Sequence, residues 1–251
     1  MVDTKQLLES IHLVYSKVLG VNVCLLIVGG SIGRGNCVEG WSDADLLLVL
    51  KNHESKSLRL VKKCEDYVRK RFNIEVDTMI TSRFTIEHTD PEKLHGKIKN
   101  FLFFLPEEKV LIQKNIKLPA VDRQKFGYGF WATYAEQEKN FLRRNADINI
   151  KDREALQGLA KKNIKIIFLI LKQFLASSSP ASSTYTYKEV LASLENIVPS
   201  HVANKLAGYE SIRAHDTLSA MSAAQLRKII SVSVELFNDL GKLMITHARN
   251  I

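Results

Sequence analysis

The sequence has few cysteines and no long apolar segment. Its three cysteines, Cys24, Cys37 and Cys64, are odd in number and irregularly spaced, which argues against a disulfide framework or a zinc site. Free thiols are typical of a reducing compartment, and residues 1–5 lack the features of a signal peptide, so we expect a cytoplasmic protein. Even the apolar run Ile166–Leu171 is too short to cross a bilayer, and we expect no association with membranes.

Acidic residues are outnumbered by basic ones. The 251 residues include 27 Asp and Glu against 36 Lys and Arg, which gives a formal net charge of +9. A basic balance favours polyanionic ligands, both nucleotides and nucleic acids. The basic residues of the helix that we expect over residues 57–72 are interleaved with acidic ones. We interpret this surface as a solvated helix face and do not favour nucleic acid as the partner.

An apolar segment rich in β-branched residues, Val21–Val28, predicts a buried strand. It ends at Gly29 and Gly30, where the backbone can turn sharply and approach a ligand closely. A second strand begins with Asp43 and Asp45 and continues as an apolar run. Residues two apart share one face of a strand, so both carboxylates lie beside the glycine turn. This arrangement suits a divalent cation with a phosphate chain next to it.

These residues could bind a nucleoside triphosphate. Two magnesium ions (Mg2+) would neutralise the phosphates during in-line displacement, with Asp43 and Asp45 as their shared ligands. Gly30 and Ser31 offer backbone N–H groups and a hydroxyl to the phosphates. Arg34 either binds the departing pyrophosphate through its guanidinium fork or forms a structural salt bridge across the loop.

The segments Gly29–Gly35 and Ser42–Leu46 resemble the signature of the polymerase-beta-type nucleotidyltransferase superfamily. The form of the signature is similar to that of the aminoglycoside and lincosamide antibiotic nucleotidyltransferases, and the likeness covers about the first half of the chain. The resemblance implies a magnesium-dependent enzyme. The residues that it assigns to the nucleotide are Gly29, Gly30, Ser31 and Arg34.

The resemblance also implies a third carboxylate on a neighbouring strand. The segment Phe72–Ile80 alternates as a strand does, and Asp77 lies between apolar residues as the family pattern requires. Asp77 would bind the metal nearer the acceptor hydroxyl and help to deprotonate that hydroxyl. Glu75 shares the same face and remains the alternative.

The first half of the chain alternates helix and strand, and the second half is helical. We expect an α+β protein, in which a small mixed β-sheet domain with helices on one side precedes an all-α helical bundle. Pro119 marks the boundary between a catalytic domain, 1–119, and a helical acceptor-binding domain, 120–251. The expected strands are 21–28, 43–50, 72–80 and 109–113. The expected helices are 4–19, 57–72, 90–104, 124–145, 153–176, 187–197, 201–214 and 223–248.

The helical half offers a candidate catalytic base. Residues 134–145 resemble the first helix of the second domain in the kanamycin-type enzymes, which carries a base glutamate. Glu138 matches that glutamate best, and Glu136 is next. Alternatively, both glutamates are exposed and make intrahelical pairs.

The chain is compact and leaves little room for a template- or tRNA-binding domain. We therefore expect transfer of AMP from ATP to a hydroxyl of a small-molecule acceptor, such as an antibiotic, with release of pyrophosphate. One alternative is nucleotidyl transfer to a protein or RNA partner, and another is a nucleotide-binding, antitoxin-like regulatory module without turnover. The three carboxylates argue against the regulatory module. The antibiotic enzymes often build their sites across dimers, so the resemblance is also compatible with a homodimer.

Overall fold

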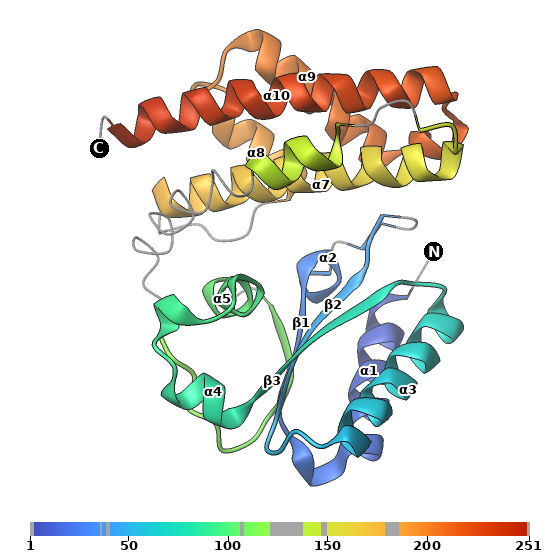
Figure 1. The fold of residues 1–251 in the computed structure, drawn as a ribbon, viewed down its shortest axis with the longest axis vertical. Coiled ribbons are helices and arrows are strands. Elements are labelled where there is room, and N and C mark those ends of the chain that lie inside the picture. The colour runs from blue at the N-terminus through green and yellow to red at the C-terminus, as the bar shows by residue number, and fades with distance from the viewer. Residues whose placement is uncertain are drawn as a thin grey trace. The chain divides into compact units, whose positions relative to one another are not determined.

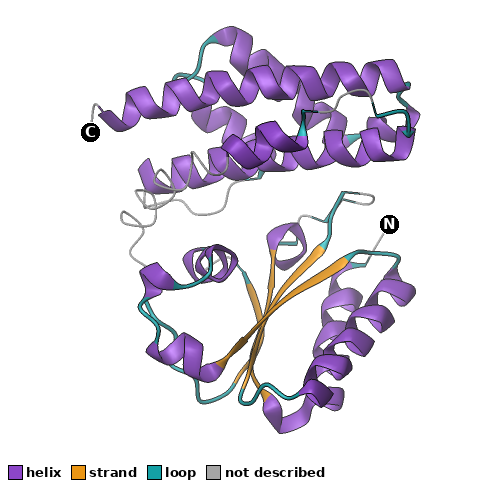
Figure 2. Ribbon diagram, viewed as in Figure 1, coloured by secondary structure: helices purple, strands orange, loops and turns teal. Residues whose placement is uncertain are grey.

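The computed structural model describes residues 3–35, 37–38, 41–105, 108–120, 138–146, 150–178 and 186–249. The chain divides into two compact units, Met1–Asp122 and Arg123–Ile251 (Figure 1). The first unit combines helices with a β-sheet, and the described part of the second unit is helical (Figure 2). The predicted α+β fold class is confirmed.

The first unit is built on a four-stranded sheet with the strand order β3-β2-β1-β4. Strand β1 pairs antiparallel with both β2 and β4, whereas β2 pairs parallel with β3, so the sheet is mixed as predicted. The third strand begins at Val76, four residues after the start at residue 72 that the alternation of apolar and polar residues predicts. The strands are β1 (Val23–Gly29), β2 (Ala44–Leu50), β3 (Val76–Ser82) and β4 (Lys109–Gln113).

Two long helices, α1 (Thr4–Leu19) and α3 (Ser55–Phe72), cover one face of this sheet (Figure 1). Helix α1 begins at Asp3, whose carboxylate accepts a hydrogen bond from the backbone N–H of Gln6. The apolar residues of both helices recur at helical spacing and pack against alternate residues of β1 and β2. The core on this face includes Leu7, Ile11, Tyr15, Val61, Cys64, Val68, Leu26, Val28, Leu46 and Leu48.

Shorter helices, α4 (Arg83–His88) and α5 (Gly96–Phe103), cover the opposite face (Figure 1). All seven residues of β1 are buried, and a strand that is apolar on both sides needs cover on both sides. The prediction that helices lie on only one side of the sheet is therefore wrong, because α4 and α5 cover the second apolar face. The core on this face includes Ile86, Ile98, Phe101 and Leu102 packed against Leu25, Ile27, Leu47 and Val49.

The helix predicted over residues 90–104 is divided in the structure. Asp90 and Pro91 begin only a short 3-10 turn, Pro91–Lys93. Helix α5 starts afresh at Gly96, where the side chain of His95 accepts a hydrogen bond from the backbone N–H of Lys97. The break places Lys97 in the first turn of α5.

The second unit is a set of packed helices. The long helices α7 (Arg153–Ser178) and α10 (Ala223–Arg249) pack against each other. The rings of Phe141 and Phe237 stack with their centroids 4.2 Å apart. Residues 138–144 are helical, whereas most of the predicted helix 124–145 lies outside the described residues. The other helices are α8 (Tyr187–Leu194) and α9 (Ser200–Ala214).

None of the described helices combines the length and the apolar character that a bilayer-spanning segment requires.

Because the sheet is packed on both faces, truncation of a leucine in β2 should destabilise the protein much more than truncation of an exposed leucine. Leu48 is fully buried in β2, whereas Leu13 of α1 is 57% exposed. We expect Leu48→Ala to lower the free energy of unfolding by about 2–5 kcal/mol, because it removes buried contacts and leaves a cavity. Leu13→Ala should change it by less than about 0.5 kcal/mol. Urea unfolding followed by circular dichroism measures both, and equal effects would contradict the burial of β2.

Candidate active site

The structure brings Asp45 and Asp77 together on neighbouring strands. Strands β2 and β3 are parallel, and their register places these two residues directly opposite each other. Asp43 stands just before β2, two residues from Asp45, and its charge acts on Asp45. Three acidic groups, from two chain segments that lie side by side in the sheet, are therefore close together where β2 and β3 begin.

The surroundings of Asp45 disfavour the ionised form of its carboxyl group. Its pKa is raised, first by burial and then by the negative charge of Asp43, with a smaller contribution from Asp77. The charge and the hydrogen bond of Lys97 act in the opposite direction. The negative form of Asp45 is therefore unfavourable unless a positive charge lies close to it.

That positive charge is Lys97, from the first turn of α5. Its Nζ lies 3.2 Å from Asp45 Oδ1 and donates a hydrogen bond of 2.5 Å to Asp77 Oδ2. Burial alone would lower the pKa of Lys97, but the hydrogen bond to Asp77 and the charge of Asp45 outweigh burial and raise it. The ammonium form is therefore stabilised between the two carboxylates.

The alternative third acid, Glu75, lies elsewhere. It precedes β3, its side chain is 79% exposed, and its carboxylate pairs with Arg69 at 3.3 Å. Asp77 is the acid that faces Asp45, so the geometry favours Asp77 over Glu75 as the third carboxylate of the site.

The glycine turn lies against the same acids. Gly29 ends β1 directly opposite Asp45, and Gly30 has a φ of +68°, which favours glycine. A Cβ atom added to Gly30 would lie 3.3 Å from Asp45 Oδ2. The hydroxyls of Ser31 and Ser42 share a hydrogen bond of 2.7 Å. The turn is thereby tied to the segment that leads into Asp43.

Arg34 forms a salt bridge in this structure. Its Nη1 lies 2.6 Å from Glu108 Oε1, and both side chains are largely buried. The structural alternative from the sequence is thus observed. A guanidinium carries five N–H donors, so Arg34 can contact Glu108 and still have donors for a phosphate. Binding of a phosphate by Arg34 therefore stays a prediction.

Glu138, the predicted base, belongs to the second unit and lies in the helical segment 138–144, partly exposed. Glu136 lies outside the described residues. The role of Glu138 therefore stays a prediction.

Carboxylates such as those of Asp43, Asp45 and Asp77 are suitable ligands for a divalent cation. In this structure, however, Asp45 and Asp77 are bridged by the ammonium group of Lys97. Within the described part of the chain, no group of three or more His, Cys, Asp or Glu side chains is arranged to hold a metal ion. Carboxylate oxygens are nevertheless the ligands that magnesium prefers. The ammonium of Lys97 shows that positive charge is accommodated between Asp45 and Asp77.

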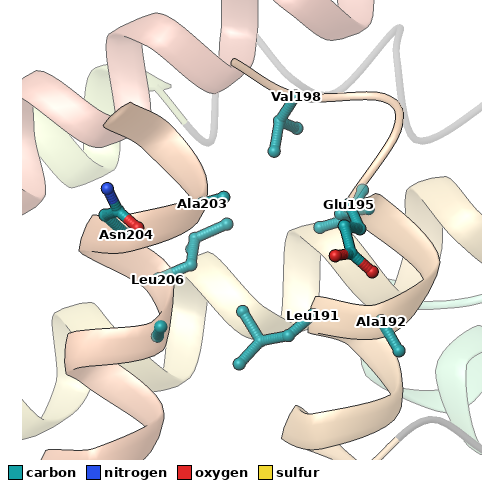
Figure 3. A pocket seen from close by; sticks show the side chains of 9 residues that line it. Leu191, Ala192, Glu195, Val198, Ala203, Asn204 and Leu206 are labelled. Atoms are coloured by element: carbon teal, nitrogen blue, oxygen red, sulfur yellow. The ribbon is translucent and has the colours of Figure 1, made fainter. Parts of the chain in front are cut away.

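A separate pocket of about 260 Å³ lies in the second unit, between α8 and α9 (Figure 3). Its lining is mainly apolar and includes Leu191, Val198 and Leu206, with Glu195 and Asn204 as the polar residues. None of the candidate site residues lines it, and we assign it no role in the chemistry.

Comparisons with known proteins agree with the geometry. Residues 16–115 match the family model described as a nucleotidyltransferase domain. Among solved structures, the chain is similar in fold to spectinomycin adenyltransferase AAD(9) from Enterococcus faecialis, solved with ATP and spectinomycin. The TM-score is 0.58 and the sequence identity 12%, and the match covers 94% of this chain and 100% of that chain. None of the curated proteins compared with the chain matches it.

The glycine turn allows a matched test. Gly30 and Gly20 both have positive φ values, but only Gly30 approaches Asp45. Either alanine substitution should destabilise the protein by about 1–2 kcal/mol because of backbone strain. Only Gly30→Ala should also weaken binding of a non-hydrolysable ATP analogue, by about tenfold or more, through the added contact beside Asp45. Calorimetric titration measures this, and equal affinities in the two variants would exclude Gly30 from the nucleotide site.

Proposed function

Because the chain carries a nucleotidyltransferase domain, we propose that it transfers AMP from ATP to a hydroxyl group of a small-molecule acceptor and releases pyrophosphate. The observation that carries this proposal is the register of β2 and β3, which pairs Asp45 with Asp77 beside the glycine turn. The enzyme class itself follows from the domain match, which confirms the predicted nucleotidyltransferase.

The proposed reaction is an in-line displacement at the α-phosphorus. The acceptor oxygen forms a new bond to this phosphorus, the bond to the bridging oxygen of the β-phosphate breaks, and pyrophosphate leaves. Asp77 would hold the metal nearer the acceptor hydroxyl and so help to deprotonate it, and Glu138 would accept the proton. Asp77 is suited to its role because its side chain is 71% exposed and so accessible to an acceptor.

The remaining roles fall to groups around the turn. Backbone N–H groups and the hydroxyl of the segment Gly29–Ser31 hold the β- and γ-phosphates, and Arg34 contributes positive charge at the edge of the turn. Asp43, Asp45 and Asp77 would hold magnesium, which when bound neutralises the charge that builds on the phosphates.

A small acceptor is favoured by one comparison. The similar structure from Enterococcus faecialis was solved with ATP and spectinomycin, a small molecule. We propose that the helical domain, 120–251, binds the acceptor and that Glu138 takes part in activating the acceptor hydroxyl.

Asp43→Asn and Asp45→Asn test the acidic site. Each should lower the rate of pyrophosphate release from ATP and magnesium, across a panel of hydroxylated small molecules, by about 10²-fold or more, because each removes a carboxylate that would hold the magnesium beside the phosphates. Chelation of the metal should abolish the activity, and added magnesium should restore it.

Asp66→Asn is the matched control, because the side chain of Asp66 in α3 is 43% exposed and its described ion pairs are with Lys62 and Arg69, outside the candidate site. This variant should retain wild-type turnover. Full activity in Asp45→Asn would end the assignment, whereas turnover with RNA or protein acceptors alone would replace the small molecule with a macromolecular acceptor.

Glu138→Gln tests the proposed base. We expect kcat to fall by about 10²-fold with little change in KM, because a general base acts mainly in the chemical step. Glu235→Gln is the control, since Glu235 is an exposed partner of Lys205 in the same unit. Steady-state kinetics with the best acceptor decides between them, and equal kcat values in the two variants would make Glu138 a surface residue.

A further inference from the structure

The ammonium of Lys97 lies between two carboxylates of the candidate site. It contacts one oxygen of Asp45 and one of Asp77, at 3.2 and 2.5 Å. The two acids come from adjacent strands in register, so their carboxylates repel each other unless positive charge lies between them. A single side chain from a third element supplies that charge.

The backbone of Lys97 is held firmly, whereas its side chain can move. Ile98, Phe101 and Leu102 anchor α5 in the core beneath the sheet, and the N–H of Lys97 is bound by the side chain of His95. The side chain of Lys97 is 27% exposed, and a lysine stem has several rotatable bonds. The ammonium can therefore leave the acids without any change in the fold.

We infer that Lys97 is a built-in counter-cation of the acidic site, which holds Asp45 and Asp77 in place without metal and is displaced when a divalent cation binds. The inference rests on the proposed function and deepens it, because it makes this lysine a determinant of metal affinity. Lys97 is a positioning residue here, since it acts through the carboxylates.

Competition follows from charge and space. A divalent cation bound to the same carboxylate oxygens would stand within a few ångströms of the ammonium, and like charges at that separation repel strongly in a partly buried site. Binding of the metal must therefore include removal of Lys97 from Asp45 and Asp77. The exchange lowers the apparent metal affinity relative to a site without the lysine.

Lys97→Met tests the competition directly. We expect the Kd for Mn2+, measured by calorimetry on the full chain without nucleotide, to fall by about tenfold or more, because the competing charge is gone. The variant should also unfold at a lower temperature than the wild type in chelator and gain more thermal stability from Mn2+.

Two variants complete the series. Lys99→Met removes the same charge from the same helix, but the ammonium of Lys99 donates to the backbone carbonyl of Glu92. It should leave the Kd for Mn2+ near the wild-type value. Lys97→Arg retains the positive charge and should also bind Mn2+ with an affinity close to that of the wild type.

A second measurement uses the wild-type protein and does not depend on any variant. Acetylation of lysine amines, followed by peptide mass spectrometry, should modify Lys97 several-fold faster with saturating Mn2+ than in chelator, because the metal frees the ammonium. Lys99 is the internal control and should react at the same rate in both conditions.

The outcomes separate this inference from the proposed function. An unchanged or weaker Mn2+ affinity in Lys97→Met, no Mn2+ binding by either protein, or metal-independent acetylation of Lys97 would each overturn the inference. Pyrophosphate release by the wild-type enzyme is measured separately. Turnover together with any of these results would leave the proposed function intact and remove only the role of Lys97.

Discussion

Repulsion among three carboxylates at one edge of a sheet is the constraint on which the rest of this site depends. The parallel pairing of β2 and β3 sets Asp45 opposite Asp77, and the charge of Asp43 also raises the pKa of Asp45. Such a cluster persists only when positive charge is held nearby. In this protein the ammonium of Lys97 supplies it, and in the proposed reaction a metal–nucleotide complex would do so.

The fold holds this unfavourable cluster in place through its two-sided core. Strand β1 and most of β2 are buried under helices on both faces. The acids therefore lie at the end of strands that are packed on both sides. Local stability lost to charge repulsion is offset by burial elsewhere in the same strands. Gly30 fits the same plan, because a side chain there would crowd Asp45.

Much of the first unit was predictable because its signals are local. Apolar β-branched runs indicated strands, and all four expected strands are present, with the start of the third one displaced. The prediction of one continuous helix over residues 90–104 was wrong, because the favourable start at Asp90 and Pro91 supports only a 3-10 turn before α5 begins. The local sequence does not distinguish the two roles of Arg34, because its partner Glu108 is 74 positions away.

The strands, the glycine turn and the paired acids Asp43 and Asp45 could be predicted from the sequence alone, because each depends on composition and spacing within a few residues. The nucleotidyltransferase class was implied by the resemblance of the segments Gly29–Gly35 and Ser42–Leu46 to the superfamily signature. In contrast, the three-dimensional packing was needed to show that Asp77 rather than Glu75 faces Asp45 and that Lys97 bridges Asp45 and Asp77. Strand register and the packing of α5 bring together residues that are distant in the chain, and no local periodicity encodes such contacts.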